Sequence, residues 1–229
     1  GFLSENAKFA ELCAKCNIAF IGPSAEIIHR MGNKSEARKT MMEAGVPVVP
    51  GSKTPVYTVE EARKMAEEIG YPVMIKASSG GGGKCMRISR GPEDFDANFQ
   101  NAQMESIKGF SDDTMYLERY VERPRHIEFQ ILADKYGNVV HLGERDCSIQ
   151  RRHQKVVEYA PAFSVPMETR QVILDSAIRL AKQVGYQNAG TLEFLVDADN
   201  NPYFIEMNPR IQVEHTVTEE ITGIDIVQA

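Results

Sequence analysis

GTLEFLVDADNNPYFIEMNPRIQVE, residues 190–214, is the stretch that decides the fold. Two apolar runs flank the polar turn at 199–201, which is typical of a β-hairpin. Because alternate residues of a strand share a face, Glu193 should lie on the face opposite Leu192 and Phe194. The polar residues of the second strand share one parity: they are Glu206, Asn208, Arg210, Gln212 and Glu214. A half-buried strand that carries so much charge needs a ligand to offset desolvation, so the hairpin predicts a binding site.

The bulk composition is that of an ordinary soluble globular protein. The chain has 229 residues, of which 42% are hydrophobic and 25% charged, and its formal net charge is −6. An acidic balance argues against a general affinity for nucleic acid, and no apolar run is long enough to span a bilayer. The sequence begins at Gly1 and stops inside an expected helix, so we expect a protein that is truncated at both ends.

Four cysteines are present, and two of them form a C-x-x-C at Cys13 and Cys16. Their spacing matches one face of a helix, so we favour packing over a zinc or redox site. The cysteines indicate a reducing compartment.

The order of elements predicts an α+β fold in three parts. Residues 1–47 have the pattern of the tail of a Rossmann-like α/β domain, with a helix at 4–17 capped by Ser4 and a buried strand at 18–21. Residues 48–120 form a small module that can act as a lid, with a helix at 58–69, strands at 71–76, 86–89 and 115–120, and a helix at 93–106. Residues 121–229 are rich in strands and contain a helix at 167–184.

A glycine loop lies between two strands of the small module. Four consecutive glycines, residues 80–83, free the backbone to aim N–H groups at phosphate oxygens, and Lys76 ends the preceding strand. The alternative is a flexible hairpin tip, which we consider less favoured. The spacing is that of neither a P-loop nor a dinucleotide-binding loop.

Oxygen ligands and an anion site follow from the hairpin. Glu193, Glu206 and Asn208 can converge on Mg²⁺, which prefers oxygen ligands and retains substrate phosphates. The alternative is one solvated sheet face. Arg210 and Gln212 suit a carboxylate or bicarbonate. Glu214 can act as a general base, as an ion-pair partner of Arg210, or as both.

A basic segment, QRRHQK at 150–155, is interpreted as a positively charged loop near a triphosphate. The chain is acidic and the segment carries no interleaved aromatic residue, which disfavours nucleic acid. His126, Glu128 and Gln130 share one strand face and can line the same cleft. A nucleophile pair of Cys147 and His153 has no further support.

These residues together resemble the ATP-grasp superfamily and, within it, the biotin carboxylase component of biotin-dependent carboxylases. The resemblance covers essentially the whole chain. Its most specific motifs are QRRHQK at 150–155 and RIQVEH at 210–215, and it extends to FIGP at 20–23, MGNK at 31–34, PRHIE at 124–128 and ERDCS at 144–148. The segment HTVTEEIT at 215–222 is more similar to pyruvate carboxylases than to bacterial acetyl-CoA carboxylases.

The resemblance implies a role for each matching residue. The implied ATP-binding residues are Lys34, Lys76, Gly80, Gly81, Gly82, Gly83, Glu118, Arg119, Val121, His126, Gln150 and His153. The implied bicarbonate-binding residues are Lys155, Arg210, Gln212 and Val213. The implied metal ligands are Glu193, Glu206 and Asn208. The implied catalytic residues are Glu214, Arg210 and Lys155, with Glu214 as the base.

The implied reaction is the ATP-dependent carboxylation of biotin with bicarbonate through carboxyphosphate. It uses Mg²⁺ or Mn²⁺, and biotin is the substrate, carried on a carrier domain. The implied partners are a biotinyl carrier domain and a carboxyltransferase domain or subunit, in a homo-oligomeric parent in the cytoplasm, or in the mitochondrial matrix of a eukaryote. No nucleic acid or membrane is expected as a partner.

Two departures from the family pattern concern the glycine loop. Ser79 and Cys85 stand where the family has glycine. Because the chain also lacks the ends of the family's domain, we expect it to turn over slowly or not at all by itself. The alternatives are another ATP-grasp ligase that activates bicarbonate or a carboxylate, such as a carbamoyl-phosphate synthetase half, and an inactive nucleotide-binding fragment.

Overall fold

A computed structural model describes residues 3–32, 34–78, 85–151 and 154–229. The chain divides into two compact units, each with its own core. The large unit comprises Gly1–Val48 and Arg123–Ala229, and the small unit comprises Val49–Glu122. None of the helices in the described ranges is both long and apolar enough to cross a membrane.

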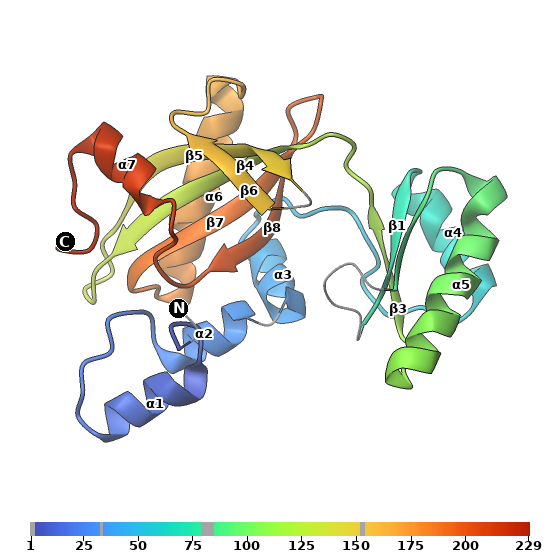
Figure 1. The fold of residues 1–229 in the computed structure, drawn as a ribbon, viewed down its shortest axis with the longest axis horizontal. Helices are drawn as coiled ribbons and strands as arrows, with labels where there is room; N and C mark the ends of the chain where they lie inside the picture. Colours follow the sequence, from blue (N-terminus) through green and yellow to red (C-terminus); the bar gives the residue numbers. More distant parts are fainter. Residues whose placement is uncertain (1–2, 33, 79–84, 152–153) are drawn as a thin grey trace. The chain divides into compact units, whose positions relative to one another are not determined.

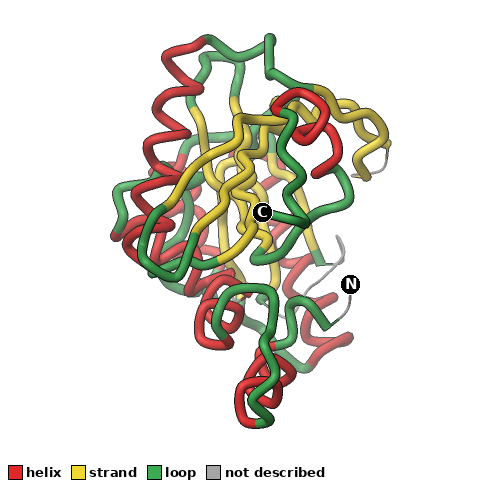
Figure 2. The backbone as a smooth tube through the Cα atoms, turned by 90° about the vertical axis from the view of Figure 1, so that its left-hand side faces the viewer, coloured by secondary structure: helices red, strands yellow, loops and turns green. Residues whose placement is uncertain are grey.

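An antiparallel five-stranded sheet forms the centre of the large unit, with the strand order β6-β5-β4-β7-β8 (Figure 1). Its twist is visible along the backbone trace (Figure 2). The strands are β4 (Arg125–Ala133), β5 (Val139–Arg151), β6 (Gln154–Tyr159), β7 (Asn188–Val196) and β8 (Pro202–Asn208).

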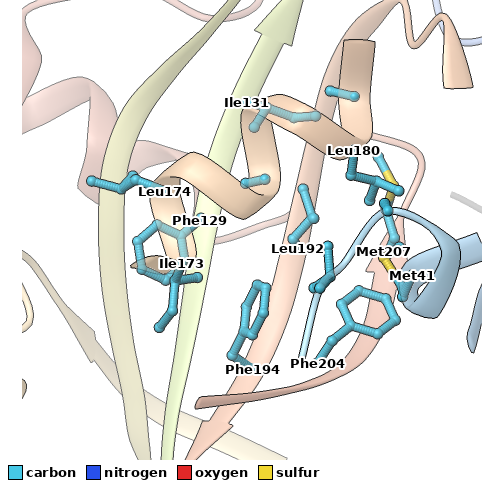
Figure 3. Packing of buried hydrophobic residues seen from close by; sticks show 14 of the residues in the cluster. Met41, Phe129, Ile131, Ile173, Leu174, Leu180, Leu192, Phe194, Phe204 and Met207 are labelled. Atoms are coloured by element: carbon cyan, nitrogen blue, oxygen red, sulfur yellow. The ribbon is translucent and has the colours of Figure 1, made fainter. Parts of the chain in front are cut away.

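One face of this sheet is apolar and packs against helix α6 (Met167–Val184). Phe194 lies between Phe129 and Phe204 in edge-to-face contacts, with ring centroids 5.9 and 5.7 Å apart (Figure 3). Such a core leaves the other face of the sheet for polar side chains. Leu192 and Phe194 are in the core, and Glu193 is on the other face, as predicted.

The remaining helices of the large unit are α1 (Ala7–Lys15), α2 (Ala25–Gly32), α3 (Lys34–Glu43) and α7 (His215–Thr222). The N-cap of α1 is Asn6, whose side chain accepts the N–H of Phe9, and not Ser4. The predicted buried strand at 18–21 is wrong. The segment has no strand pairing, and Ile18 and Ile21 are 60% and 85% exposed.

The predicted second strand of the hairpin ends earlier than expected. β8 stops at Asn208, because Pro209 follows and has no N–H to donate to the ladder. Arg210, Gln212 and Glu214 therefore lie in the loop between β8 and α7 and do not continue the strand. The strand parity predicted for these three residues is thus wrong. The loop nevertheless brings Gln212 into contact with Glu193, and Glu214 into contact with Lys155, on the polar face of the sheet.

The small unit is a three-stranded antiparallel sheet in the order β2-β1-β3, covered by two helices. Its elements are α4 (Val59–Ile69), β1 (Val73–Ala77), β2 (Met86–Ser89), α5 (Pro92–Phe110) and β3 (Met115–Arg119). Thr58 caps α4 by accepting the Glu61 N–H, as the sequence predicts. The predicted phosphate loop, Gly80, Gly81, Gly82 and Gly83, lies outside the described residues.

Candidate functional site

Lys155 is the centre of a cluster of carboxylates in the large unit. Its ammonium donates to Glu128, to Glu193 Oε1 at 3.0 Å and to Glu214 Oε1 at 2.7 Å. These acids come from β4, from β7 and from the residue that precedes α7. One cation therefore links the predicted base to a predicted metal ligand.

The register of the strands explains why these acids lie together. Glu193 is the cross-strand partner of Glu128 on one side and of Glu206 on the other. Directly opposed residues of an antiparallel pair share a face, with Cβ atoms about 5 Å apart. Glu193 and Glu206 therefore point to the same side of the sheet, which is the arrangement a shared cation requires.

Glu193 is almost completely surrounded by hydrogen-bond donors. Its Oε1 accepts from Asn208 Nδ2 at 2.8 Å and from Gln212 Nε2 at 3.0 Å, and its Oε2 lies 2.6 Å from His126 Nε2. Burial raises the pKa of Glu193, but the His126 hydrogen bond and the Lys155 charge outweigh it and lower that pKa to about 2. The Glu193 carboxylate is therefore ionised at neutral pH.

The pKa values of Glu214 and Lys155 are also shifted by their charged neighbours. Burial raises the pKa of Glu214, but the hydrogen bond from Lys155 outweighs it, so the net shift is downward. Burial lowers the pKa of Lys155, but Glu128 and Glu193 outweigh it and raise that pKa. Both residues line a cavity of about 450 Å³, which also includes Val213. A small anion entering this cavity meets an ammonium beside a carboxylate.

Arg210 belongs to a different set of contacts. Its Nε donates to Glu5 Oε2 at 2.9 Å, and its Nη2 donates to Asn208 Oδ1 at 3.2 Å. Glu214 pairs with Lys155, so the alternative ion pair between Glu214 and Arg210 is not observed. Arg210 also lines a second cavity, of about 750 Å³.

His126 and Gln150 extend the polar face along β4 and β5. Gln150 Nε2 lies 2.8 Å from His126 Nδ1, and the other ring nitrogen of His126 meets Glu193. The segment predicted as a positively charged loop is largely strand, because Gln150 belongs to β5 and Lys155 to β6. His153 lies outside the described residues, as does the side chain of Lys34.

Four predicted nucleotide-binding residues, Lys76, Glu118, Arg119 and Val121, belong to the described part of the small unit. Lys76 forms an ion pair with Glu118, because both lie on the same face of neighbouring strands β1 and β3. The Arg119 N–H donates to the Pro50 carbonyl at 2.8 Å, and Val121 follows the end of β3. The small unit thus keeps its predicted lysine and acid together.

The residues of the large unit fit a magnesium ion. Glu193 and Glu206 share a face and offer the carboxylate oxygens that Mg²⁺ prefers. Asn208 turns its amide nitrogen to Glu193, and its amide oxygen accepts from Arg210. His126, Glu128 and Glu193 also bring possible ligand atoms within 4.8 Å of one another. The Lys155 ammonium already bridges Glu128 and Glu193, which disfavours a metal ion between those two acids.

Sequence reasoning assigned no role to Arg145, which the structure places directly behind this cluster. Its side chain is fully buried and contacts Glu128, Gln130 and Thr218. The sequence offered one sign of a buried role for Arg145, namely its place in the ERDCS motif, which the structure shows to be part of strand β5.

The chain was compared with known proteins. The sequence model "Carbamoyl-phosphate synthase L chain, ATP binding domain" matches residues 33–229, and "Biotin carboxylase, N-terminal domain" matches residues 1–28. The chain is 56% identical to a biotin carboxylase of Nostoc over 99% of its length and 51% of that relative. It is 54% identical to a pyruvate carboxylase of Schizosaccharomyces pombe, covering all of the chain and 19% of the relative.

Solved structures agree with this relationship. The biotin carboxylase domain of the 2-oxoglutarate carboxylase of Hydrogenobacter thermophilus, solved as a dimer with MgADP, ADP and bicarbonate, has a TM-score of 0.84 and 54% identity. The match covers 100% of this chain and 50% of that domain. The ATP-grasp fold predicted from the sequence is confirmed, and the chain spans about half the length of the biotin carboxylases that it matches. The chain therefore belongs to the family of the carbamoyl-phosphate synthase L chain ATP-binding domain, within which it is a homologue of biotin carboxylases.

Proposed function

We propose that this chain forms the ATP- and bicarbonate-binding part of a biotin carboxylase. The observation that carries the proposal is the contact of Lys155 with both Glu193 and Glu214, which joins a cation-binding face to a small anion cavity. The H. thermophilus domain, described with MgADP and bicarbonate, supports it.

The cation of the nucleotide is assigned to the β7–β8 face. Glu193 and Glu206, with Asn208 beside them, would hold Mg²⁺ or Mn²⁺. When bound, the ion would neutralise charge that develops on the phosphate oxygens during phosphoryl transfer. Glu193 is suited to this role because its carboxylate stays ionised at neutral pH.

The anion is assigned to the region around Lys155. Lys155, Gln212 and the backbone of Val213 hold bicarbonate, and Glu214 takes its proton. The assignment of Arg210 to bicarbonate rests on the sequence motif, because its contacts here are with Glu5 and Asn208. A bicarbonate oxygen then attacks the γ-phosphorus, which gives carboxyphosphate and ADP. Carboxyphosphate breaks down to carbon dioxide and phosphate. The phosphate takes the N1′ proton of biotin, and N1′ then attacks carbon dioxide to form carboxybiotin. Arg210 also stabilises the enolate form of biotin.

The resemblance assigns ATP-binding residues within each unit taken by itself. Lys76, Glu118, Arg119 and Val121 are the contributions of the small unit. His126 and Gln150 are those of the large unit and already orient each other. The assignments of Lys34, Gly80, Gly81, Gly82, Gly83 and His153 rest on the sequence motifs.

The partners follow from the relatives. This chain covers only 19% of the pyruvate carboxylases that it matches. Such relatives support a longer parent protein that also has a biotinyl carrier and a carboxyltransferase, either as domains or as subunits. The dimer of the H. thermophilus domain supports a homo-oligomer. We place the parent in the cytoplasm, or in the mitochondrial matrix if it is eukaryotic.

The test compares two nitrogen acceptors in the complete polypeptide that contains this chain. ADP release is measured with MgATP and bicarbonate, with free biotin or with ammonia added. The proposal expects biotin to stimulate ADP release and ammonia to have no effect. Stimulation by ammonia alone would favour a carbamoyl-phosphate synthetase-like ligase. Nucleotide binding without bicarbonate-dependent ADP release would favour an inactive nucleotide-binding protein.

The chain by itself calls for a separate measurement. We expect it to bind ADP but to convert ATP to ADP slowly or not at all. A bicarbonate-dependent rate equal to that of the complete polypeptide would contradict this expectation.

A further inference from the structure

A buried arginine lies behind the carboxylate cluster and has no assigned role. Arg145 is on β5 with no exposed side-chain surface, and its Nε donates to Glu128 Oε1. Its Nη1 donates to Thr218 Oγ1 at 2.7 Å and to Gln130 Oε1 at 3.0 Å. Longer contacts of 3.5 Å join its Nη2 to Thr191 and Gln212. Every nitrogen of the guanidinium thus has an oxygen partner.

Stability alone does not account for this pair. Burying an arginine and a glutamate costs a large desolvation free energy, and replacing a buried ion pair by apolar residues of similar volume is often neutral or stabilising. Glu128 and Arg145 are both fully buried. The pair is therefore better explained by what its remaining atoms contact.

Those contacts lead to Lys155 and Glu214, two of the residues assigned to bicarbonate. Glu128 uses one oxygen for Arg145 and the other for the Lys155 ammonium. Arg145 also reaches Thr218 in the first turns of α7, whose N-cap is Glu214. Arg145 and Glu128 together thus touch Lys155 on one side and the helix that begins after Glu214 on the other.

We propose that Arg145 and Glu128 are a positioning pair that holds the Lys155 ammonium and the start of α7 so that Lys155 and Glu214 meet. The inference rests on the proposed function, because it assumes that Lys155 and Glu214 serve bicarbonate. Neither Arg145 nor Glu128 is a catalytic residue in this account, since both act through their neighbours.

The test uses an apolar double variant and a matched control. Arg145→Met with Glu128→Leu removes the pair but keeps its volume. Arg170→Met with Glu144→Leu removes another ion pair, between the partly exposed Arg170 and the buried Glu144. Glu144 is the neighbour of Arg145 on β5 and so faces the opposite side of the sheet. Urea unfolding, calorimetry with metal-free ADP, and ¹³C NMR of bicarbonate with MgADP are measured on both variants and on the unsubstituted chain.

The expected result is a selective loss. The Arg145→Met, Glu128→Leu variant unfolds cooperatively and binds ADP normally, but its bicarbonate affinity falls by about 10- to 100-fold, as for other residues that orient ligands. The control variant keeps both affinities. Unchanged bicarbonate affinity in the first variant would overturn the proposal. If that variant does not fold, Glu128→Gln decides the question, and again unchanged bicarbonate affinity overturns it.

A failure of the proposed function gives a different pattern. If the unsubstituted chain binds ADP but no bicarbonate, the proposed function is what fails for this chain. The positioning claim is then decided by hydrogen exchange at the first turn of α7, where the Val217 N–H donates to the Glu214 carbonyl at 3.2 Å. Faster exchange in the Arg145→Met, Glu128→Leu variant, but not in the control, supports positioning, and equal exchange overturns it.

Discussion

Lys155 Nζ lies 2.7 Å from Glu214 Oε1. The two residues are 59 positions apart, on β6 and at the start of α7. The same ammonium also contacts Glu128 and Glu193, so its charge is shared among three acids. This sharing couples the ionisation of Glu214 to that of Glu128 and Glu193.

Removing the Lys155 ammonium should destabilise the large unit. Lys155→Met leaves Glu128, Glu193 and Glu214 close together without their common counter-charge. Loss of one member of a buried ion pair costs about 3 kcal/mol in the free energy of unfolding. Urea unfolding measures this cost. Lys182→Met, at an exposed position of α6, serves as control and should leave the unfolding free energy unchanged.

Glu214 should be required for bicarbonate-dependent turnover but not for nucleotide binding. Glu214→Gln keeps the shape and can still accept a hydrogen bond from Lys155, but it cannot take a proton. Loss of a general base reduces kcat by about 10²- to 10⁴-fold. The assay is ADP release by the complete polypeptide, with ADP affinity measured in parallel. A kcat close to that of the unsubstituted enzyme would remove Glu214 from the base role.

The pH dependence of turnover should follow the same residue. Glu214 acts as a base only when it is ionised, and its contact with Lys155 lowers its pKa below the usual carboxyl range. Activity limited by this group is therefore retained as the pH falls toward that range and is lost only at lower pH. Substituting Lys155 should move this acid limb to higher pH, because the lowering contact is gone.

Stability should depend on pH through Glu193. Its pKa of about 2 in the folded chain is below the ordinary glutamate value of 4.5, so the stabilisation is complete above pH 4.5 and is lost as the pH falls toward 2. The shift corresponds to about 3 kcal/mol in the free energy of unfolding. Urea unfolding is measured between neutral pH and pH 2. The free energy of unfolding should fall less steeply with decreasing pH for Glu193→Gln than for the unsubstituted chain. An identical pH profile would show that Glu193 is not held ionised by its neighbours.

Glycine should be more stable than alanine when either replaces Cys85. Its φ is 56°, which is the left-handed region that costs an L-residue about 1 kcal/mol. Both substitutions remove the thiol, so Cys85→Gly should be more stable than Cys85→Ala by about this amount. Cys147 provides a control within β5, where the order should reverse because glycine weakens a strand. Equal stability of the two Cys85 variants would mean that this backbone is not strained.

Much of the fold can be predicted from local pattern. The helix expected at 167–184 is α6 with the same limits, since its periodicity is strong and Gly185 ends it in the left-handed conformation. The opposite placement of Glu193 and Phe194 follows from strand alternation alone. Thr58 was identified as a cap because its partner lies only three residues away.

The missed features depend on distant contacts. The charge of the segment 150–155 predicts a loop, but its described residues belong to β5 and β6, which pair with each other. Arg145 meets Thr218 across 73 positions, and no periodicity reveals such a contact. The parity of the polar residues predicts a strand that continues past Pro209, but a proline cannot donate to the ladder and β8 ends at Asn208.

The central claim is that Glu193 and Glu206, as cross-strand partners, hold the cation of a nucleotide. The most direct measurement is calorimetry of ADP binding to this chain with and without Mg²⁺, for the unsubstituted chain and for Glu206→Gln, with Glu220→Gln on the exposed side of α7 as control. The account predicts that Mg²⁺ strengthens ADP binding in the unsubstituted chain and in the control, and that Glu206→Gln weakens this gain by at least about tenfold. A magnesium effect of the same size in all three proteins would contradict the claim.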